Sequence, residues 1–161
     1  MLEPPSFAGV SETLLIPLAA RGLARRREPA LGFADPEAER LVELFPERLA
    51  PYAKDRTTQR GIILREQWFD AVVLAFAECN PTGLVIDLGC GLTTGQARLA
   101  ERLPVGLRWL NLDLPPVIEA RQRLLIEPRV AKTLAADLAE PGWMEQVAAE
   151  GGPFLLLAQG L

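Results

Sequence analysis

The sequence predicts an α/β fold in which a doubly wound parallel sheet of four strands follows an N-terminal helical segment. Two observations predict it. Residues 1–80 carry only helical patterns, and after Asn80-Pro81 short apolar runs alternate with helical patterns. Alternating strands and helices form a parallel sheet whose right-handed crossovers place helices on both faces. We therefore expect a helical segment over residues 1–80 and a Rossmann-like core over residues 81–161.

The helical segment is expected to hold three helices, each opened by a residue whose side-chain oxygen can cap the first turn. They span residues 11–27, 36–45 and about 58–79, and their opening residues are Ser11, Asp35 and Thr57 or Thr58. Arginines at positions 25–27 end the first helix, where cations suit the helix dipole. Pro46 and Pro51 interrupt residues 46–58, which are predicted to form a loop.

The core is expected to alternate strictly between strands and helices. The predicted strands cover residues 84–88, 107–112, 130–135 and 154–158, and the predicted helices cover residues 96–103, 117–125 and 142–149. Such units pack with the carboxyl ends of all strands at one edge of the sheet, where ligands bind in open α/β folds. Side chains at the four strand ends are therefore the first candidates for a functional site.

The composition excludes several kinds of chemistry. The chain has 161 residues, a net charge of −4 and no histidine, so it carries no Ser-His-Asp triad and no histidine metal ligand. No metal site is predicted. No basic field is present to bind nucleic acid, and no apolar stretch reaches the length that spans a membrane. Without a signal peptide pattern, the protein is expected to be cytoplasmic, with Cys79 and Cys90 reduced.

The strongest local signal is the glycine turn that follows the first strand. Asp87 is followed by Gly89 and Gly91, and a third glycine stands at position 95, one place later than in the dinucleotide fingerprint. Glycines let a backbone turn sharply and let a ligand approach it closely. The Asp-x-Gly-x-Gly form is typical of S-adenosylmethionine sites, although a tight turn without a ligand would carry the same glycines.

Two further acids stand at the ends of the next two strands. Asp113 follows the second strand and can accept hydrogen bonds from both hydroxyls of an adenosine ribose, or it can cap the next helix. Asp137 follows the third strand and can accept from an adenine amino group, with Leu138 beside the base, or it can cap the helix that contains Trp143. A row of acids along one sheet edge favours a ligand that contains adenosine.

The sequence resembles the class I S-adenosylmethionine-dependent methyltransferases, and within them the leucine carboxyl methyltransferase family near its bacterial polyketide carboxyl O-methyltransferases. The resemblance covers most of the chain. Its most specific part is Leu112-Asp113-Leu114-Pro115-Pro116-Val117-Ile118, and it extends to residues 10–21, 35–38, 59–70, 128–129, 137 and 143.

The resemblance implies a cofactor and a set of roles. Arg65 would hold the methionine carboxylate of S-adenosylmethionine, since a guanidinium matches carboxylate geometry; the alternative is a surface arginine. The cofactor-binding set that we predict consists of Arg65, Asp87, Gly89, Gly91, Asp113, Leu114, Asp137, Leu138 and Gln159. The methyl acceptor would be a carboxylate or hydroxyl of a small molecule, with residues 1–80 forming a lid and the acceptor side. No catalytic residue is predicted.

The sequence also departs from the family's pattern. Thr93 and Gly95 stand where the family has an acid and an arginine, and Gln159 stands where it has a glutamate. A binding protein that keeps the cofactor pocket without turnover is therefore the alternative function, and a nicotinamide-dependent enzyme is disfavoured by the glycine spacing. The sequence stops where the fourth strand ends, which predicts a truncated chain, and an uncovered fourth strand would favour a homodimer.

Overall fold

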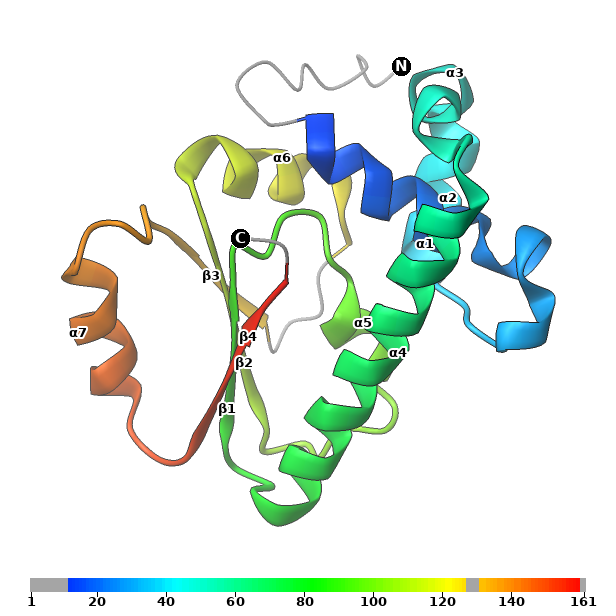
Figure 1. The fold of residues 1–161 in the computed structure, drawn as a ribbon. Helices are drawn as coiled ribbons and strands as arrows, with labels where there is room; N and C mark the ends of the chain where they lie inside the picture. The colour runs from blue at the N-terminus through cyan, green and yellow to red at the C-terminus, as the bar shows by residue number, and fades with distance from the viewer. Residues whose placement is uncertain (1–11, 127–130, 160–161) are drawn as a thin grey trace.

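A computed structural model describes residues 12–126 and 131–159 and shows a parallel sheet between layers of helices (Figure 1). The strands are β1 (Leu84–Leu88), β2 (Arg108–Asp113), β3 (Ala131–Ala135) and β4 (Phe154–Ala158). They lie in the order β3-β2-β1-β4, and every neighbouring pair is parallel. The predicted doubly wound sheet of four strands is confirmed. The predictions that involve Ser11, Val130 and residues 128–129 lie outside the described residues.

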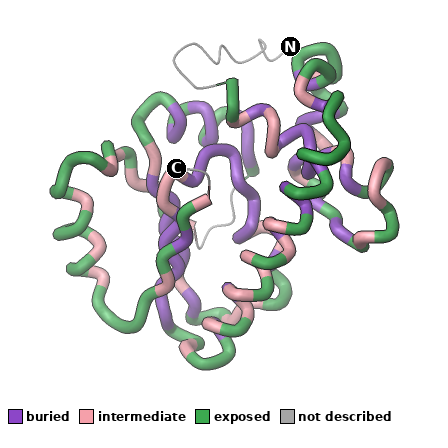
Figure 2. Tube along the Cα trace, viewed as in Figure 1, coloured by how far each residue is buried: buried purple, intermediate pink, exposed green. Residues whose placement is uncertain are grey.

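The central strand explains why the sheet forms around it. Val85 and Ile86 of β1 have no exposed surface, because β1 is covered on both faces by helices and on both edges by neighbouring strands. A strand buried on both faces must be a nearly continuous apolar run, which is how β1 stands out in the sequence. Figure 2 shows buried residues concentrated along the sheet and in the turn that follows β1.

Helices cover both faces of the sheet. They are α1 (Leu15–Arg27), α2 (Pro36–Leu44), α3 (Pro46–Leu49), α4 (Arg56–Cys79), α5 (Gly95–Leu99), α6 (Pro115–Leu124) and α7 (Gly142–Glu150), with 3₁₀ turns η1 (Glu12–Leu14), η2 (Pro29–Leu31) and η3 (Ala50–Ala53). Residues of α4 and α5 pack with Val85 and Trp109 on one face, and α7 packs on the other face against Ile86 and Leu110.

The predicted loop over residues 46–58 is wrong. Pro46 is the first residue of α3, and Pro51 lies in the first turn of η3. Proline breaks a helix interior but fits its first turn, where the backbone N–H has no intrahelical partner. The long helix α4 begins at Arg56, and its cap is Asp55, whose carboxylate accepts from the backbone N–H groups of Thr57 and Thr58.

The other predicted elements differ only at their ends. The helix expected over residues 96–103 is α5, which stops at Leu99 and continues as turns. Arg25, Arg26 and Arg27 form the last turn of α1, as predicted. Among the described residues, no helix combines the length and the apolar character needed to cross a membrane.

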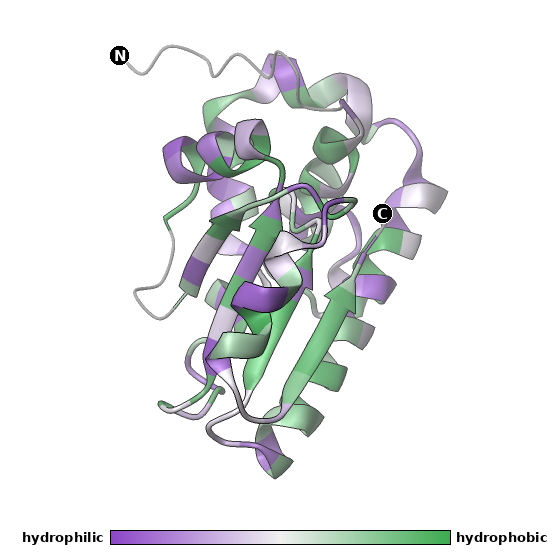
Figure 3. Cartoon of the chain, turned by 90° about the vertical axis from the view of Figure 1, so that its left-hand side faces the viewer, coloured by the Kyte–Doolittle hydropathy of each residue, from purple (hydrophilic) through white to green (hydrophobic). Residues whose placement is uncertain are grey.

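Strand β4 pairs with β1 and has no second strand beside it within residues 12–126 and 131–159. Phe154 and Leu156, on the face away from α4, are 56% and 47% exposed. Figure 3 shows the mostly apolar strand that ends near the C-terminus. Pairing of this edge with a second copy stays a prediction, as does the division of the chain near Pro81.

The N-terminal helices are fixed to the core through one apolar cluster. Leu15 and Leu18 of α1 pack with Leu41 of α2, with Val117 of α6, and with Leu92 in the turn after β1. The helices approach closely at Gly22 of α1, where an added Cβ would lie 2.5 Å from the backbone oxygen of Ala38 on α2. Side chains of α1 can therefore reach the carboxyl edge of the sheet.

We expect Gly22→Ala to destabilise the protein by about 1–3 kcal/mol, because the new methyl group meets backbone and α1 must move away from α2. Gly61→Ala is the matched control, since Gly61 lies in the second turn of α4 with open space around it. That substitution should stabilise by about 0.5–1 kcal/mol through helix propensity. Urea unfolding of both variants measures the difference, and equal midpoints would contradict the close approach.

Candidate functional site

The connection from β1 to α5 is a turn whose backbone favours glycine at two positions. Gly89 and Gly91 have φ angles of 60° and 50°, in the left-handed region that strains other residues. A Cβ added at Gly91 would also lie 2.7 Å from Leu14 Cδ2. The turn therefore brings bare backbone to the carboxyl end of the central strand, as the sequence predicted.

Charged side chains hold the peptide groups of Gly91 from two sides. The Gly91 N–H donates to Asp113 Oδ2 at 2.7 Å, and the Gly91 carbonyl accepts from Arg121 Nη1 at 2.8 Å. The same Arg121 nitrogen donates to the Thr93 carbonyl at 2.9 Å, and Arg121 has no exposed surface. Hydrogen bonds to charged groups are stronger than neutral ones, so strand β2 and helix α6 together fix the turn.

A buried ion cluster ties the N-terminal helices to the same turn. The cluster consists of Arg21, Asp35, Glu66, Asp70 and Arg98, which come from α1, α4, α5 and the residue before α2. Arg21 Nε donates to Asp35 at 2.9 Å, and its Nη2 donates to the Leu92 carbonyl at 2.6 Å. Arg98 lies 2.8 Å from Glu66 and 2.7 Å from Asp70.

The cluster sets the charge state of its members. Burial alone would raise the pKa of Asp35, but the guanidinium groups of Arg21 and Arg98 hold that pKa below its ordinary value. At Asp70 burial wins over the Arg98 guanidinium, and the pKa of this carboxyl is raised. Asp35 therefore stays ionised in the interior, whereas Arg98 only partly compensates the burial of the Asp70 charge.

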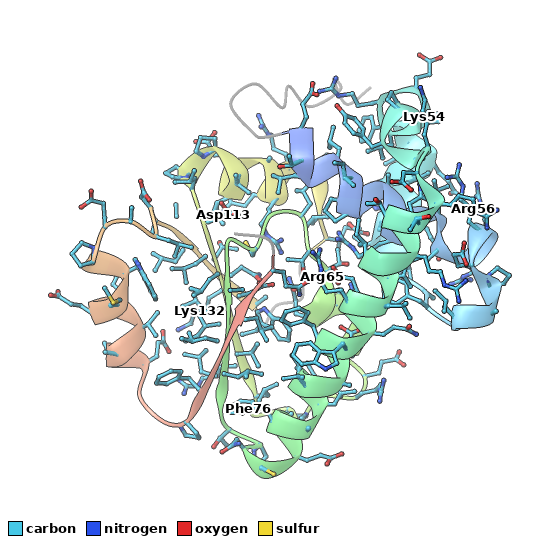
Figure 4. The ribbon with its side chains drawn as sticks, in the orientation of Figure 1. Lys54, Arg56, Arg65, Phe76, Asp113 and Lys132 are labelled. Atoms are coloured by element: carbon cyan, nitrogen blue, oxygen red, sulfur yellow. The ribbon has the colours of Figure 1, made fainter. Side chains whose placement is uncertain are left out.

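A small cavity of about 50 Å³ opens against the turn. It is lined by Leu14, Pro17, Arg21, Arg65, Glu66, Gly89, Cys90, Gly91, Leu92, Thr93 and Gln159. In Figure 4, Arg65 projects from α4 toward this end of the sheet, and Asp113 lies at the end of β2. The structure thus brings Arg65, Gly89, Gly91 and Gln159 together around one cavity. Asp113 does not line the cavity, but it accepts a hydrogen bond from Gly91 in the same turn.

Arg65 is the cation in this wall that is open to a ligand. Its Nε is buried and has no hydrogen-bond partner, and the side chain forms no ion pair with any residue that the structure describes. Arg21, in contrast, is committed to Asp35 and to the Leu92 carbonyl. A carboxylate in the cavity would satisfy the orphaned donor of Arg65 with matching geometry.

Asp87 lies beneath the turn and not in the wall of the cavity. The side chain is 1% exposed, and neither carboxyl oxygen has a hydrogen-bond partner among the described residues. Burial raises its pKa to about 7; the charge of Arg121 opposes the rise, whereas Glu66 adds to it. Asn111, its register partner on β2, also has an unpartnered Nδ2, whereas its Oδ1 accepts from the indole of Trp109 at 3.1 Å.

The remaining predicted residues lie farther along the edge. Asp113 does not cap α6, because Leu114 occupies the cap position, but Asp113 Oδ1 accepts from the Leu114 N–H at 2.7 Å. Leu114 is 46% exposed. Asp137 is exposed and accepts from the N–H of Ala139 in a turn, and Pro141 occupies the cap position of α7, so the alternative role of Asp137 as a helix cap is excluded. Leu138 packs with the apolar residues under α7.

The arginines that hold the turn, Arg121 and Arg21, are not among the site residues predicted from the sequence. Arg121 stands among buried positions of α6, three residues after Ile118 and three before Leu124, and Arg21 has the same placement on α1 between Leu18 and Ala24. The available signal was an arginine at a helix position whose neighbours three residues away are apolar, which indicates a buried charge. Among the described residues, no group of His, Cys, Asp or Glu is arranged to hold a metal ion.

We expect Asp87→Asn to stabilise the ligand-free protein at alkaline pH. A carboxyl whose pKa is raised by folding favours the folded state while protonated, so its contribution is lost as pH rises from about 4 to about 7. The loss is on the order of 4 kcal/mol and is absent from the variant. Thermal unfolding between pH 4 and 8 measures it, with Asp137→Asn on an exposed turn as the control. Parallel pH profiles of parent and Asp87→Asn would contradict this interpretation.

Comparison with known proteins gives two matches. The model of the leucine carboxyl methyltransferase family matches residues 15–154. The chain is also 31% identical over 162 residues to the tetracenomycin polyketide synthesis O-methyltransferase TcmP of Streptomyces glaucescens, an alignment that covers 100% of this chain and 58% of that protein. The chain thus spans less than two thirds of the length of this relative. Since the family match extends from the first residue of α1 to the first residue of β4, the chain belongs to the leucine carboxyl methyltransferase family.

Proposed function

We propose that the protein is an S-adenosylmethionine-dependent O-methyltransferase that transfers a methyl group to a carboxylate or other oxygen of a small molecule. The observation that carries the proposal is the combination of a fixed glycine turn with an unpartnered Arg65 across the cavity from it. Family membership and the likeness to a polyketide O-methyltransferase support the same reaction class.

We propose that the predicted residues contact the cofactor along its length. Arg65 would bind its carboxylate, and Gly89 and Gly91 would let its amino-acid part lie against the backbone. Asp113 already accepts from Gly91 and Leu114, which fixes the plane of its carboxylate and leaves lone pairs for the ribose hydroxyls. Asp137 and Leu138 would contact the adenine, and Gln159 would close the cavity beside β4.

Entry of the cofactor requires a movement at the start of α1. The cavity, at about 50 Å³, is much smaller than the roughly 300–1,000 Å³ of small-molecule sites. Leu14 and Pro17 form its outer wall, and Leu14 lies directly over Gly91. We infer that Leu14 of η1 and the first turn of α1 move outward for binding, while the hydrogen bonds from Gly91 to Asp113 and from Arg121 to Gly91 stay in place.

In the methyl transfer, the main task of the protein would be to align the methyl donor with the acceptor oxygen. The bound sulfonium supplies an activated methyl group, and an ionised carboxylate is already a nucleophile. The chain has no histidine to act as a base. Its residues would therefore act by orienting the cofactor and excluding water, an effect of proximity.

The alternative is a cofactor-binding protein without turnover. Gln159 is the observation that favours it, because this cavity residue can donate or accept a hydrogen bond but carries no charge. Transfer of a labelled methyl group from S-adenosylmethionine to small carboxylic acids separates the two functions. We expect label in ester products; binding of the cofactor product with no label in any acceptor would favour the binder.

We expect S-adenosylhomocysteine to bind with a dissociation constant in the micromolar range and NAD not to bind. Arg65→Gln should weaken S-adenosylhomocysteine about tenfold or more and leave adenosine, which has no carboxylate, unchanged. Asp113→Asn should weaken both ligands, because it removes the ribose contact. Isothermal titration calorimetry measures these affinities.

Arg60→Gln is the control for the loss of an arginine from α4, since Arg60 is 60% exposed and does not line the cavity. Failure of the parent protein to bind S-adenosylhomocysteine would sink the proposed function. Binding that Arg65→Gln leaves unchanged would show only that Arg65 has another role.

A further inference from the structure

The wall of the cavity at the glycine turn contains a carboxylate directly beside Arg65. Glu66 is the next residue of α4, is 2% exposed and lines the same cavity. Consecutive residues of a helix point in different directions, so their side chains do not face each other. Arg65 and Glu66 accordingly form no ion pair with one another, although both are described in the structure. Each charge needs another partner.

One carboxyl oxygen of Glu66 keeps its capacity to accept a hydrogen bond. Its Oε2 accepts from Arg98 Nη2 at 2.8 Å. Its Oε1 lies 3.7 Å from Arg21 Nη1, which is too far for a hydrogen bond, and it accepts from no other residue that the structure describes. The Arg21 guanidinium is directed instead to Asp35 and to the Leu92 carbonyl. Oε1 is therefore the oxygen left for a ligand in the cavity.

The charge balance of the buried ion cluster also favours a cation beside Glu66. The cluster has three carboxylates and two guanidinium groups, which leaves one negative charge in excess. Asp35 accepts from both Arg21 and Arg98, and both oxygens of Asp70 accept from Arg98. Glu66 accepts a single hydrogen bond from a guanidinium. The excess charge is therefore least compensated at the carboxylate that lines the cavity.

The spacing of Arg65 and Glu66 limits the ligand that can satisfy both. The Cα atoms of consecutive residues are about 3.8 Å apart. Both side chains line one cavity of about 50 Å³, so their ligand groups must also lie close together. An α-amino acid group carries an ammonium and a carboxylate on the same carbon atom. The amino-acid end of S-adenosylmethionine has this arrangement.

We propose that Glu66 Oε1 binds the ammonium group of the cofactor while Arg65 binds its carboxylate. This assignment rests on the proposed function and adds a specificity-determining residue to its site. The ammonium would supply the positive charge that the buried ion cluster lacks. Asp87, the other acid beside the turn, lies beneath it and does not line the cavity.

The first test uses the parent protein and two analogues of S-adenosylhomocysteine, one deaminated and one decarboxylated. We expect each analogue to bind at least about tenfold more weakly than S-adenosylhomocysteine, because each leaves one charge of the wall without a partner. Isothermal titration calorimetry measures the affinities. Equal binding of S-adenosylhomocysteine and the deaminated analogue would overturn this assignment and leave the proposed function standing. No binding of S-adenosylhomocysteine would overturn both.

The second test assigns the ammonium to Glu66. Glu66→Gln keeps the size of the side chain and an oxygen for Arg98 but loses the charge. We expect it to weaken S-adenosylhomocysteine and the decarboxylated analogue about tenfold and to leave the deaminated analogue unchanged. Arg65→Gln should show the reverse pattern, weakening the deaminated analogue and leaving the decarboxylated one unchanged.

Asp70→Asn is the matched control, because it removes a carboxylate from the same ion cluster but not from the wall of the cavity. It should keep the parent's preference for S-adenosylhomocysteine over the deaminated analogue within about twofold. If Glu66→Gln retains that preference in full, another acceptor holds the ammonium and the assignment is wrong.

Thermal unfolding shows whether Glu66→Gln folds. If it does not, Glu66→Asp keeps the charge and draws it back by one methylene group, beyond hydrogen-bond reach of the ammonium. We expect this variant to lose about tenfold in the preference for S-adenosylhomocysteine over the deaminated analogue. An unchanged preference in Glu66→Asp would equally overturn the assignment.

Discussion

The shape of the candidate site depends on one residue, Gly91, whose backbone N–H and carbonyl are both held by charged side chains. Asp113 comes from the end of β2, and Arg121 comes from α6. The sheet and the apolar cluster under α1 fix these two elements, and the turn that is bonded to them is therefore held in place as well. When a turn already has its binding shape, the protein loses less conformational entropy as the ligand binds, and the affinity is higher.

The buried ion cluster extends this constraint to the N-terminal helices. Arg21 reaches from α1 to the Leu92 carbonyl, and Asp35 before α2 bonds both Arg21 and Arg98. Removing charges from water is costly, and a buried pair of this kind contributes less to stability than to a unique arrangement of its partners. The hydrogen bonds and ion pairs of the cluster join α1 and α4 to the turn: Arg21 of α1 contacts both the Leu92 carbonyl and Glu66 of α4.

The sheet could be predicted from the sequence because apolar runs and glycines act locally, whereas the contacts that hold the site depend on the tertiary fold. The run Leu84–Leu88 and the glycines after it are visible in one short window. Pro46 misled the prediction, since proline both breaks helices and begins them. The role of Arg121 could not be predicted from a short window, because its partners, the carbonyls of Gly91 and Thr93, are 30 and 28 positions away.

The central claim is that the turn has its binding shape before any ligand arrives. Amide hydrogen exchange of Gly91 in the ligand-free protein tests it most directly, because the Gly91 N–H donates to Asp113 and is buried. We expect this amide to exchange at least about a hundredfold more slowly than an unstructured peptide, as a bond that opens only rarely requires. Exchange at the unstructured rate, followed by protection only when S-adenosylhomocysteine is added, would show that the ligand forms the turn and would contradict this account.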